Sequence, residues 1–129
     1  MNESVEYLDF DDLDGLARAL LGDPPPIRDI GLLGSAVARP STTVFGQDTY
    51  PDLVAKASAL LHSIVINHAL VDGNKRLGWL VKAVSLELNE VRASRLDNDV
   101  VYDVVMWIAS TNPAFDEIAE RLGRHLRQV

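Results

Sequence analysis

Apolar residues recur every three or four positions in six segments of the chain, and this spacing constrains the fold more than any other feature of the sequence. Such a repeat places apolar side chains along one face of an α-helix, so each segment is predicted to be an amphipathic helix. Prolines at positions 24–26, 40 and 113 stand between the segments, where they stop a helix from continuing. The pattern therefore predicts an all-α fold, a compact single-domain bundle of about six helices over residues 1–129.

The first two helices are bounded by residues that cap or stop them. Asp9 or Asp11 can cap the first helix, because a carboxylate accepts hydrogen bonds from the free backbone N–H groups of the first turn. The second helix should run from about Arg28 to Ala38. The predicted apolar faces are Leu13, Leu16, Ala17, Leu20 and Leu21 in the first helix, and Ile30, Leu33 and Val37 in the second.

The third and fourth helices should meet at a turn in the middle of the chain. Pro51 suits the first position of the third helix, since its missing N–H would have no partner there. The apolar stripe of this helix extends to His68, and Asp72-Gly73 should interrupt it before the fourth helix begins at Asn74. The predicted faces are Leu53, Ala57, Leu60, Leu61, Ile64 and Val65, followed by Leu77, Leu80, Val81, Val84 and Leu88.

One extended segment and two C-terminal helices complete the expected order. Residues 41–45 are β-branched and aromatic and precede Gly46, which favours a short strand or hairpin, with a plain loop as an equal alternative. A break at residues 94–97 precedes the last two helices. Their predicted faces are Val100, Val101, Val104, Val105 and Ile108, then Phe115, Ile118, Ala119, Leu122 and Leu126.

The composition limits the partners that the protein can have. Its 12 basic and 19 acidic residues give a net charge of −7, which argues against nucleic-acid binding, since such proteins normally present a basic face. Arg121, Arg124 and Arg127 are interpreted as a solvated helix stripe. The chain has no cysteine, no apolar run of the ~20 residues that a membrane span needs, and an acidic start unlike a signal peptide. We expect a cytoplasmic protein with no membrane and no direct nucleic-acid partner.

The candidate functional residues lie within nine positions, from His68 to Arg76. They comprise a candidate base, the carboxylate of Asp72, a Gly-Asn turn and two adjacent cations. The first turn of a helix that starts at Asn74 is a natural anion site, because its backbone N–H groups have no partner there. Cations placed there lose roughly 0.3–1 kcal/mol to the helix dipole. Lys75 and Arg76 therefore indicate a bound phosphate, which would reverse that loss.

Each of these residues also has an ordinary interpretation. A lone histidine that ends an apolar face is usually a hydrogen-bonded core residue. Asp-Gly-Asn alone is a common turn, and Lys-Arg alone is a solvated patch. The joint spacing of a base, a carboxylate, a turn and two cations favours the functional interpretation.

The stretch from His68 to Trp79 resembles the signature of the Fic/Doc family, His-x-Phe-x-Asp/Glu-Gly-Asn-Gly/Lys-Arg, and Lys75 is typical of the Doc (death-on-curing) toxin branch. The likeness covers nearly the whole chain. It implies an all-helical fold and the transfer of part of a nucleotide to a protein hydroxyl. For the Doc branch it implies an ATP-dependent protein kinase with ATP and Mg²⁺ as cofactors. Such a kinase is the toxin of a bacterial toxin–antitoxin pair, with a Phd-type antitoxin as partner and elongation factor Tu as the target whose modification arrests translation.

The resemblance also implies a role for each matching residue. His68 matches the catalytic base, which suits an imidazole because it titrates near neutral pH. Asp72 matches the acid that holds Mg²⁺, and Gly73 with Asn74 matches the turn that binds the phosphates. Arg76 matches an arginine that clamps phosphate beside Lys75. The target-binding flap of the family is matched by Ser41, Thr42, Thr43, Val44 and Phe45.

Three positions depart from the pattern of the AMP-transferring members. Leu70 replaces the usual phenylalanine, Lys75 replaces a glycine, and Trp79 replaces a second arginine. The last two changes remove the clamp for AMP transfer and favour transfer of the γ-phosphate. An inhibitory Ser/Thr-x-x-x-Glu-Gly/Asn motif is also missing, so inhibition is expected to come from another chain. The alternatives are a Fic-type AMP transferase and a non-catalytic helical interaction module.

Overall fold

The computed structural model describes residues 4–92 and 98–127. These residues form six α-helices, a short 3-10 turn η1 (Arg39–Ser41) and a hairpin of two strands, β1 (Thr43–Val44) and β2 (Gln47–Asp48). The helices are α1 (Phe10–Leu21), α2 (Ile30–Ala38), α3 (Leu53–Asn67), α4 (Asn74–Leu88), α5 (Asn98–Thr111) and α6 (Phe115–Arg127). The predicted all-α fold is confirmed. Of the predicted extended segment at 41–45, Thr43 and Val44 form one strand of the hairpin, whereas Ser41 belongs to the 3-10 turn. The expected break at 94–97 lies outside the described residues.

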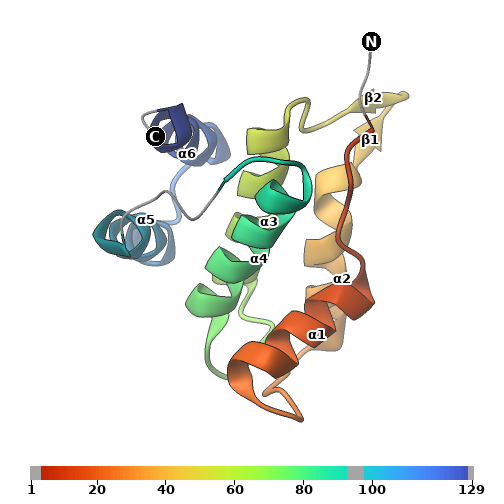
Figure 1. Ribbon diagram of the computed structural model, residues 1–129, viewed down its shortest axis with the longest axis vertical. Coiled ribbons are helices and arrows are strands. Elements are labelled where there is room, and N and C mark those ends of the chain that lie inside the picture. The colour runs from red at the N-terminus through yellow and green to blue at the C-terminus, as the bar shows by residue number, and fades with distance from the viewer. Residues whose placement is uncertain (1–3, 93–97, 128–129) are drawn as a thin grey trace.

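Helices α3 and α4 form the centre of the bundle, with α1 and α2 on one side and α5 and α6 on the other (Figure 1). Gly78 allows the two central helices to approach closely. A Cβ atom at this position would lie 3.0 Å from Val65 Cγ2 and 3.3 Å from Leu61 Cδ1. A larger side chain would therefore push α4 away from α3, and with it the connection that carries the candidate site.

Two predicted bounds of α3 are wrong. The helix begins after Asp52, whose carboxylate accepts a hydrogen bond from Ala55 N at 2.8 Å, so Pro51 precedes the cap. It ends at Asn67, before His68, which adopts left-handed backbone angles (φ 53°, ψ 51°). This conformation is uncommon outside glycine and stops the helix well before Asp72-Gly73. His68 therefore does not continue the apolar stripe of α3.

Among the described side chains, the residues of the predicted apolar faces are buried or partly buried with two exceptions. Ile30 of α2 is 63% exposed and Leu88 of α4 is 46% exposed, because each lies at a helix end where no neighbour covers it. Asp9 is the cap of α1, with a reciprocal hydrogen bond between the side chains and main chains of Asp9 and Asp12. None of the helices in the described residues combines the length and apolarity that crossing a membrane requires.

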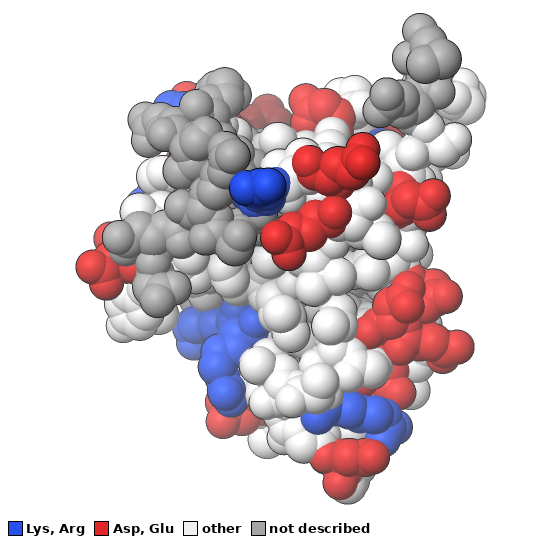
Figure 2. Space-filling view, in the orientation of Figure 1, with Lys and Arg blue, Asp and Glu red and all other residues white. Residues whose placement is uncertain are grey.

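Charge is distributed unevenly over the surface. Acidic side chains gather over α1, which carries Asp11, Asp12 and Asp14, whereas basic side chains on the same face stand apart from one another (Figure 2). This face presents no basic patch of the kind that nucleic-acid binding requires.

Lys82 is a charged residue that the helical pattern does not mark as buried, yet it is fully buried on α4. Its Nζ lies 3.3 Å from the centroid of the Trp79 ring and has no hydrogen-bond partner in the described parts of the chain. Burial lowers the pKa of Lys82 from 10.5 to about 7. A charged ammonium without a hydrogen bond destabilises the fold, and the aromatic ring offsets part of that cost.

This burial predicts a specific pH dependence of stability. Above the lowered pKa the folded protein holds Lys82 neutral while the unfolded chain still binds the proton, so the free energy of unfolding should rise from pH 7 toward pH 9. The gain is at most about 1.4 kcal/mol per pH unit, and no slope from this residue is expected below pH 6. Urea denaturation of the wild type and of Lys82→Met at pH 6, 7, 8 and 9 measures it. Parallel profiles for the two proteins would contradict the prediction.

Candidate functional site

A cavity of about 450 Å³ opens at the connection between α3 and α4. Every residue of the predicted motif site contributes to its wall, together with three apolar side chains that close it. The motif residues are His68, Asp72, Gly73, Asn74, Lys75 and Arg76, and the apolar ones are Val65, Val71 and Ala109. The structure therefore brings the base, the carboxylate and the two cations to one place, as the spacing in the sequence predicted.

A short extended segment before α2, Pro26 to Asp29, holds the residues around His68 in place. Arg28 N and Asp29 N both donate to Ala69 O, at 2.8 and 2.9 Å, and Val71 N donates to Pro26 O at 2.8 Å. The Arg28 guanidinium adds hydrogen bonds from Nε, at 3.0 Å, and from Nη2 to His68 O. These bonds fix the left-handed backbone at His68 and leave its imidazole exposed at the cavity.

The turn after His68 depends on a glycine and on an amide side chain. Gly73 has φ 89°, and a Cβ atom there would lie 2.6 Å from Leu21 Cδ2, so both backbone and packing require glycine. Asn74 is 7% exposed, and its Oδ1 and Nδ2 form hydrogen bonds of 3.0 Å with Leu70 N and Leu70 O. Its side chain therefore closes the turn, and only its main chain is free to meet a phosphate.

The beginning of α4 places free backbone N–H groups and two cations at one end of the cavity. The first hydrogen bond of the helix runs from Leu77 N to Gly73 O at 2.9 Å, so the N–H groups of the preceding three residues have no partner within the helix. Lys75 and Arg76 are exposed there, and neither is in an ion pair among the described residues. Two unpaired cations and the positive end of a helix dipole at one point are suited to an anion with several charges.

Asp72 is the one acidic residue of the cavity wall. Its Oδ1 accepts a hydrogen bond from Gly73 N at 2.9 Å, and its carboxylate is exposed. No group of three or more metal-binding side chains exists in the part of the chain that is described. A single carboxylate fits Mg²⁺, which proteins commonly hold with one or two carboxylates plus the phosphates of a substrate.

The hairpin lies apart from this cavity. It adjoins the first residue of α3, whereas His68 follows the last, and the 15 residues between them span about 22 Å (Figure 1). Lys56 holds its base through a 2.9 Å ion pair with Asp48 and a hydrogen bond to Tyr50 O. None of residues 41–45 contributes to the cavity wall, so their predicted role in target binding stays a prediction.

Arg28 is the residue of this site that sequence reasoning missed. It lies 40 positions before His68, and the sequence placed it at the start of the second helix, whereas α2 begins at Ile30 and Arg28 belongs to the extended segment before it. The one signal in the sequence is the run of three prolines at 24–26, which favours extended backbone and so a segment free to run along another part of the chain.

Replacing Arg28 by methionine should loosen the connection between α3 and α4. Hydrogen bonds to charged groups contribute about 1.5–3 kcal/mol, and the lower end applies because this residue is exposed. Hydrogen exchange of the backbone amides at positions 28, 29 and 71 should therefore accelerate roughly ten-fold. Hydrogen exchange followed by NMR measures the effect. Arg18→Met is the matched control, because Arg18 pairs with Asp14 and Asp23 on the surface of α1 and should leave those amides unchanged.

Comparison with known proteins agrees with this geometry. Residues 7–86, which include Arg28 and the whole motif, match the Fic/DOC family. The chain is also 44% identical over 120 residues to Toxin Doc of Mycolicibacterium smegmatis, and the aligned part is 92% of each chain. The protein therefore belongs to the Fic/Doc family.

Proposed function

We propose that this protein is the toxin of a bacterial toxin–antitoxin pair and that it transfers the γ-phosphate of ATP to a hydroxyl group of a protein. The observation that carries the proposal is the pair of unpaired cations, Lys75 and Arg76, at the free helix end that faces the exposed imidazole of His68. The name of the relative in Mycolicibacterium smegmatis, Toxin Doc, supports the toxin role.

In the proposed reaction, an imidazole nitrogen of His68 takes the proton of the acceptor hydroxyl. The acceptor oxygen forms a bond to the γ-phosphorus, the bond between this phosphorus and the β,γ-bridging oxygen breaks, and ADP leaves with the electron pair. Lys75, Arg76 and the main-chain N–H groups of the first turn hold the phosphate oxygens and offset their charge. Mg²⁺, when bound beside Asp72, supplies further neutralisation of that charge.

The side chains one turn into α4 favour transfer of the γ-phosphate over transfer of AMP. Trp79 occupies the position at which AMP-transferring relatives carry a second arginine. It packs against the apolar cluster between α3, α5 and α6 and holds Lys82 beneath its ring, so it offers no cation to a phosphate. Lys75 instead places an additional charge at the start of the helix.

Elongation factor Tu is the proposed target, and arrest of translation is the proposed consequence. The acceptor chain has to reach His68, and the extended segment Pro26–Asp29 is the backbone beside that residue. This segment is better placed than the hairpin to lie along the acceptor.

A Phd-type antitoxin is the proposed partner, and the cytoplasm, where elongation factor Tu works, is the proposed location.

His68→Ala should abolish phosphate transfer while leaving the fold intact, since the exposed side chain makes no contact that the core needs. Loss of a general base reduces rates by about 10²–10⁴-fold. Incubation of elongation factor Tu with Mg²⁺ and ATP that is labelled at either the α- or the γ-phosphate measures both chemistries at once. The wild type should transfer the γ label only.

Two outcomes of this assay would count against the proposal. Transfer of the α label would favour the AMP transferase, and transfer of neither label to elongation factor Tu or to any protein of a cell lysate would favour the non-catalytic module. A circular dichroism spectrum and melting temperature equal to those of the wild type serve as the folding control for His68→Ala.

Replacing Lys75 and Trp79, the two residues that depart from the AMP-transferring pattern, should shift the reaction from γ-phosphate transfer toward AMP transfer. The test protein is Lys75→Gly, Trp79→Arg and Lys82→Met together, because an arginine at position 79 would otherwise lie against the buried ammonium of Lys82. Transfer of the γ label should fall by about 100-fold, the loss typical of one charged phosphate-stabilising group, and α-label transfer should become detectable. Lys82→Met alone is the control, and equal γ transfer by the two proteins would contradict this prediction.

A further inference from the structure

A polar cluster lies outside the cavity, where the 3-10 turn after α2, the middle of α3 and the junction of α5 with α6 meet. Arg39 is at its centre, and its Nε donates a hydrogen bond to Tyr50 Oη at 2.7 Å. Its Nη1 donates at 2.9 Å both to Ser63 Oγ and to His62 Nδ1. The guanidinium also lies 5.4 Å from the centroid of the Phe115 ring, at the start of α6. One arginine thus connects three parts of the chain.

His62 extends this cluster to the end of α5. Because its Nδ1 accepts a hydrogen bond from a guanidinium that is always charged, the proton of the neutral imidazole is on Nε2. Nε2 lies 3.0 Å from Asn112 Oδ1 and therefore donates to it. Asn112 directly follows α5, has a left-handed backbone (φ 43°), and its N–H donates to Ile108 O at 2.9 Å. Its side chain thus ties the end of α5 to α3.

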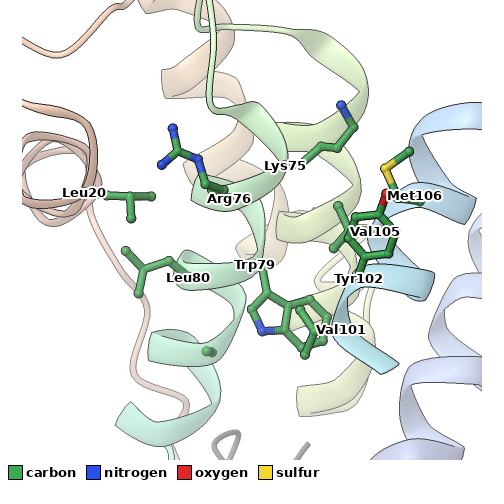
Figure 3. A pocket seen from close by; sticks show the side chains of 10 residues that line it. Leu20, Lys75, Arg76, Trp79, Leu80, Val101, Tyr102, Val105 and Met106 are labelled. Carbon is green, nitrogen blue, oxygen red and sulfur yellow. The ribbon is translucent and has the colours of Figure 1, made fainter. Parts of the chain in front are cut away.

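The end of α5 forms part of the wall of the candidate site, because Ala109, three residues before Asn112, lines the cavity there. Apolar side chains hold the middle of α5 against α3 and α6, and the hydrogen bond of Asn112 holds its end. On the side of α4, a space of about 460 Å³ lies between the two helices, with Lys75 pointing toward Tyr102 and Met106 of α5 (Figure 3). The helix therefore has room to shift on that side when its end is released.

We propose that Arg39, His62 and Asn112 form an acid-sensitive latch that fixes the end of α5 and, with it, one wall of the cavity. A second proton on the imidazole would have to occupy Nδ1, so the hydrogen bond from Arg39 would be lost and two cations would lie 2.9 Å apart. Histidine is the side chain that normally changes its charge between pH 5 and 8. The latch is therefore closed at neutral and alkaline pH and opens in acid.

The surroundings of His62 support this direction of the pH dependence. Arg39 is the charged group that the imidazole meets in this cluster. Among the described residues, the two carboxylates in the first turn of α6, Asp116 and Glu117, form no ion pair with Arg39 or His62. The other side chains of the cluster carry no charge at neutral pH; they are those of Tyr50, Ser63, Asn112 and Phe115. A protonated imidazole would thus meet a cation without a compensating anion from these elements.

Hydrogen exchange at pH 8 and pH 5.5, in the wild type and in His62→Gln, tests the latch. Glutamine is uncharged, and it can accept from Arg39 through Oε1 and donate to Asn112 through Nε2, so it imitates the neutral imidazole at both pH values. The protection factors of the backbone amides at positions 109 and 112 correct for the intrinsic pH dependence of exchange. In acid they should fall roughly ten-fold further in the wild type than in His62→Gln, about the effect of losing one hydrogen bond. His68 and Lys82 are present in both proteins, so their titration cancels in this comparison.

His62→Leu, which removes both hydrogen bonds, should already show at pH 8 the low protection that the wild type shows in acid. An equal change with pH in the wild type and His62→Gln would overturn the proposal. A loss of protection confined to position 112 would also overturn it, because the wall at Ala109 would then be independent of the latch. Phosphate transfer does not enter these measurements, so the latch and the proposed function fail separately.

Discussion

The five hydrogen bonds between the segment at 26–29 and the backbone of residues 68–71 set the geometry on which the candidate site depends. They hold His68 in a left-handed conformation, and this ends α3 and turns the chain toward α4. Asn74 closes the other side of the same turn through Leu70. The connection between α3 and α4, residues 68–73, is thus held by hydrogen bonds on both sides. As a result, the cations at the start of α4 face the imidazole of His68.

The sequence predicts the helices well because their apolar periodicity and caps are local properties. The chain alone limits the cap of α1 to Asp9 or Asp11, and the start of α3 to Pro51 or Asp52, whereas the choice within each pair needs the geometry of the first turn. The end of α3 cannot be predicted in this way, because the left-handed backbone of His68 is stabilised by an arginine 40 residues away. Lys82 is a similar case, since an isolated lysine in a helix is normally solvated, and only the packing of α4 in the bundle, with the Trp79 ring of the same helix against the Lys82 ammonium, shows its burial.

The motif predicts which residues line the cavity, but it does not predict which side chains are free and which are held by the main chain. Spacing alone groups Asn74 with the phosphate-binding residues, yet its amide is committed to the main chain of Leu70, and the adjacent lysine and arginine carry the charge. The segment that matches the family's flap contributes a strand to a hairpin, an outcome that the sequence left equal with a plain loop, and this hairpin lies at the far end of α3. Local pattern can indicate that a strand is possible, while the distance of the hairpin from the cavity depends on the length and direction of the intervening helix.

The exposed imidazole of His68 has a consequence for the reaction cycle. In the described residues no carboxylate or carbonyl forms a hydrogen bond with its ring, since the contacts of this residue are made by its main chain. No hydrogen bond within the described residues therefore selects one tautomer of the ring. If His68 is the base of the proposed reaction, its exposed position would let the proton leave to bulk water, and no relay of buried side chains would be needed.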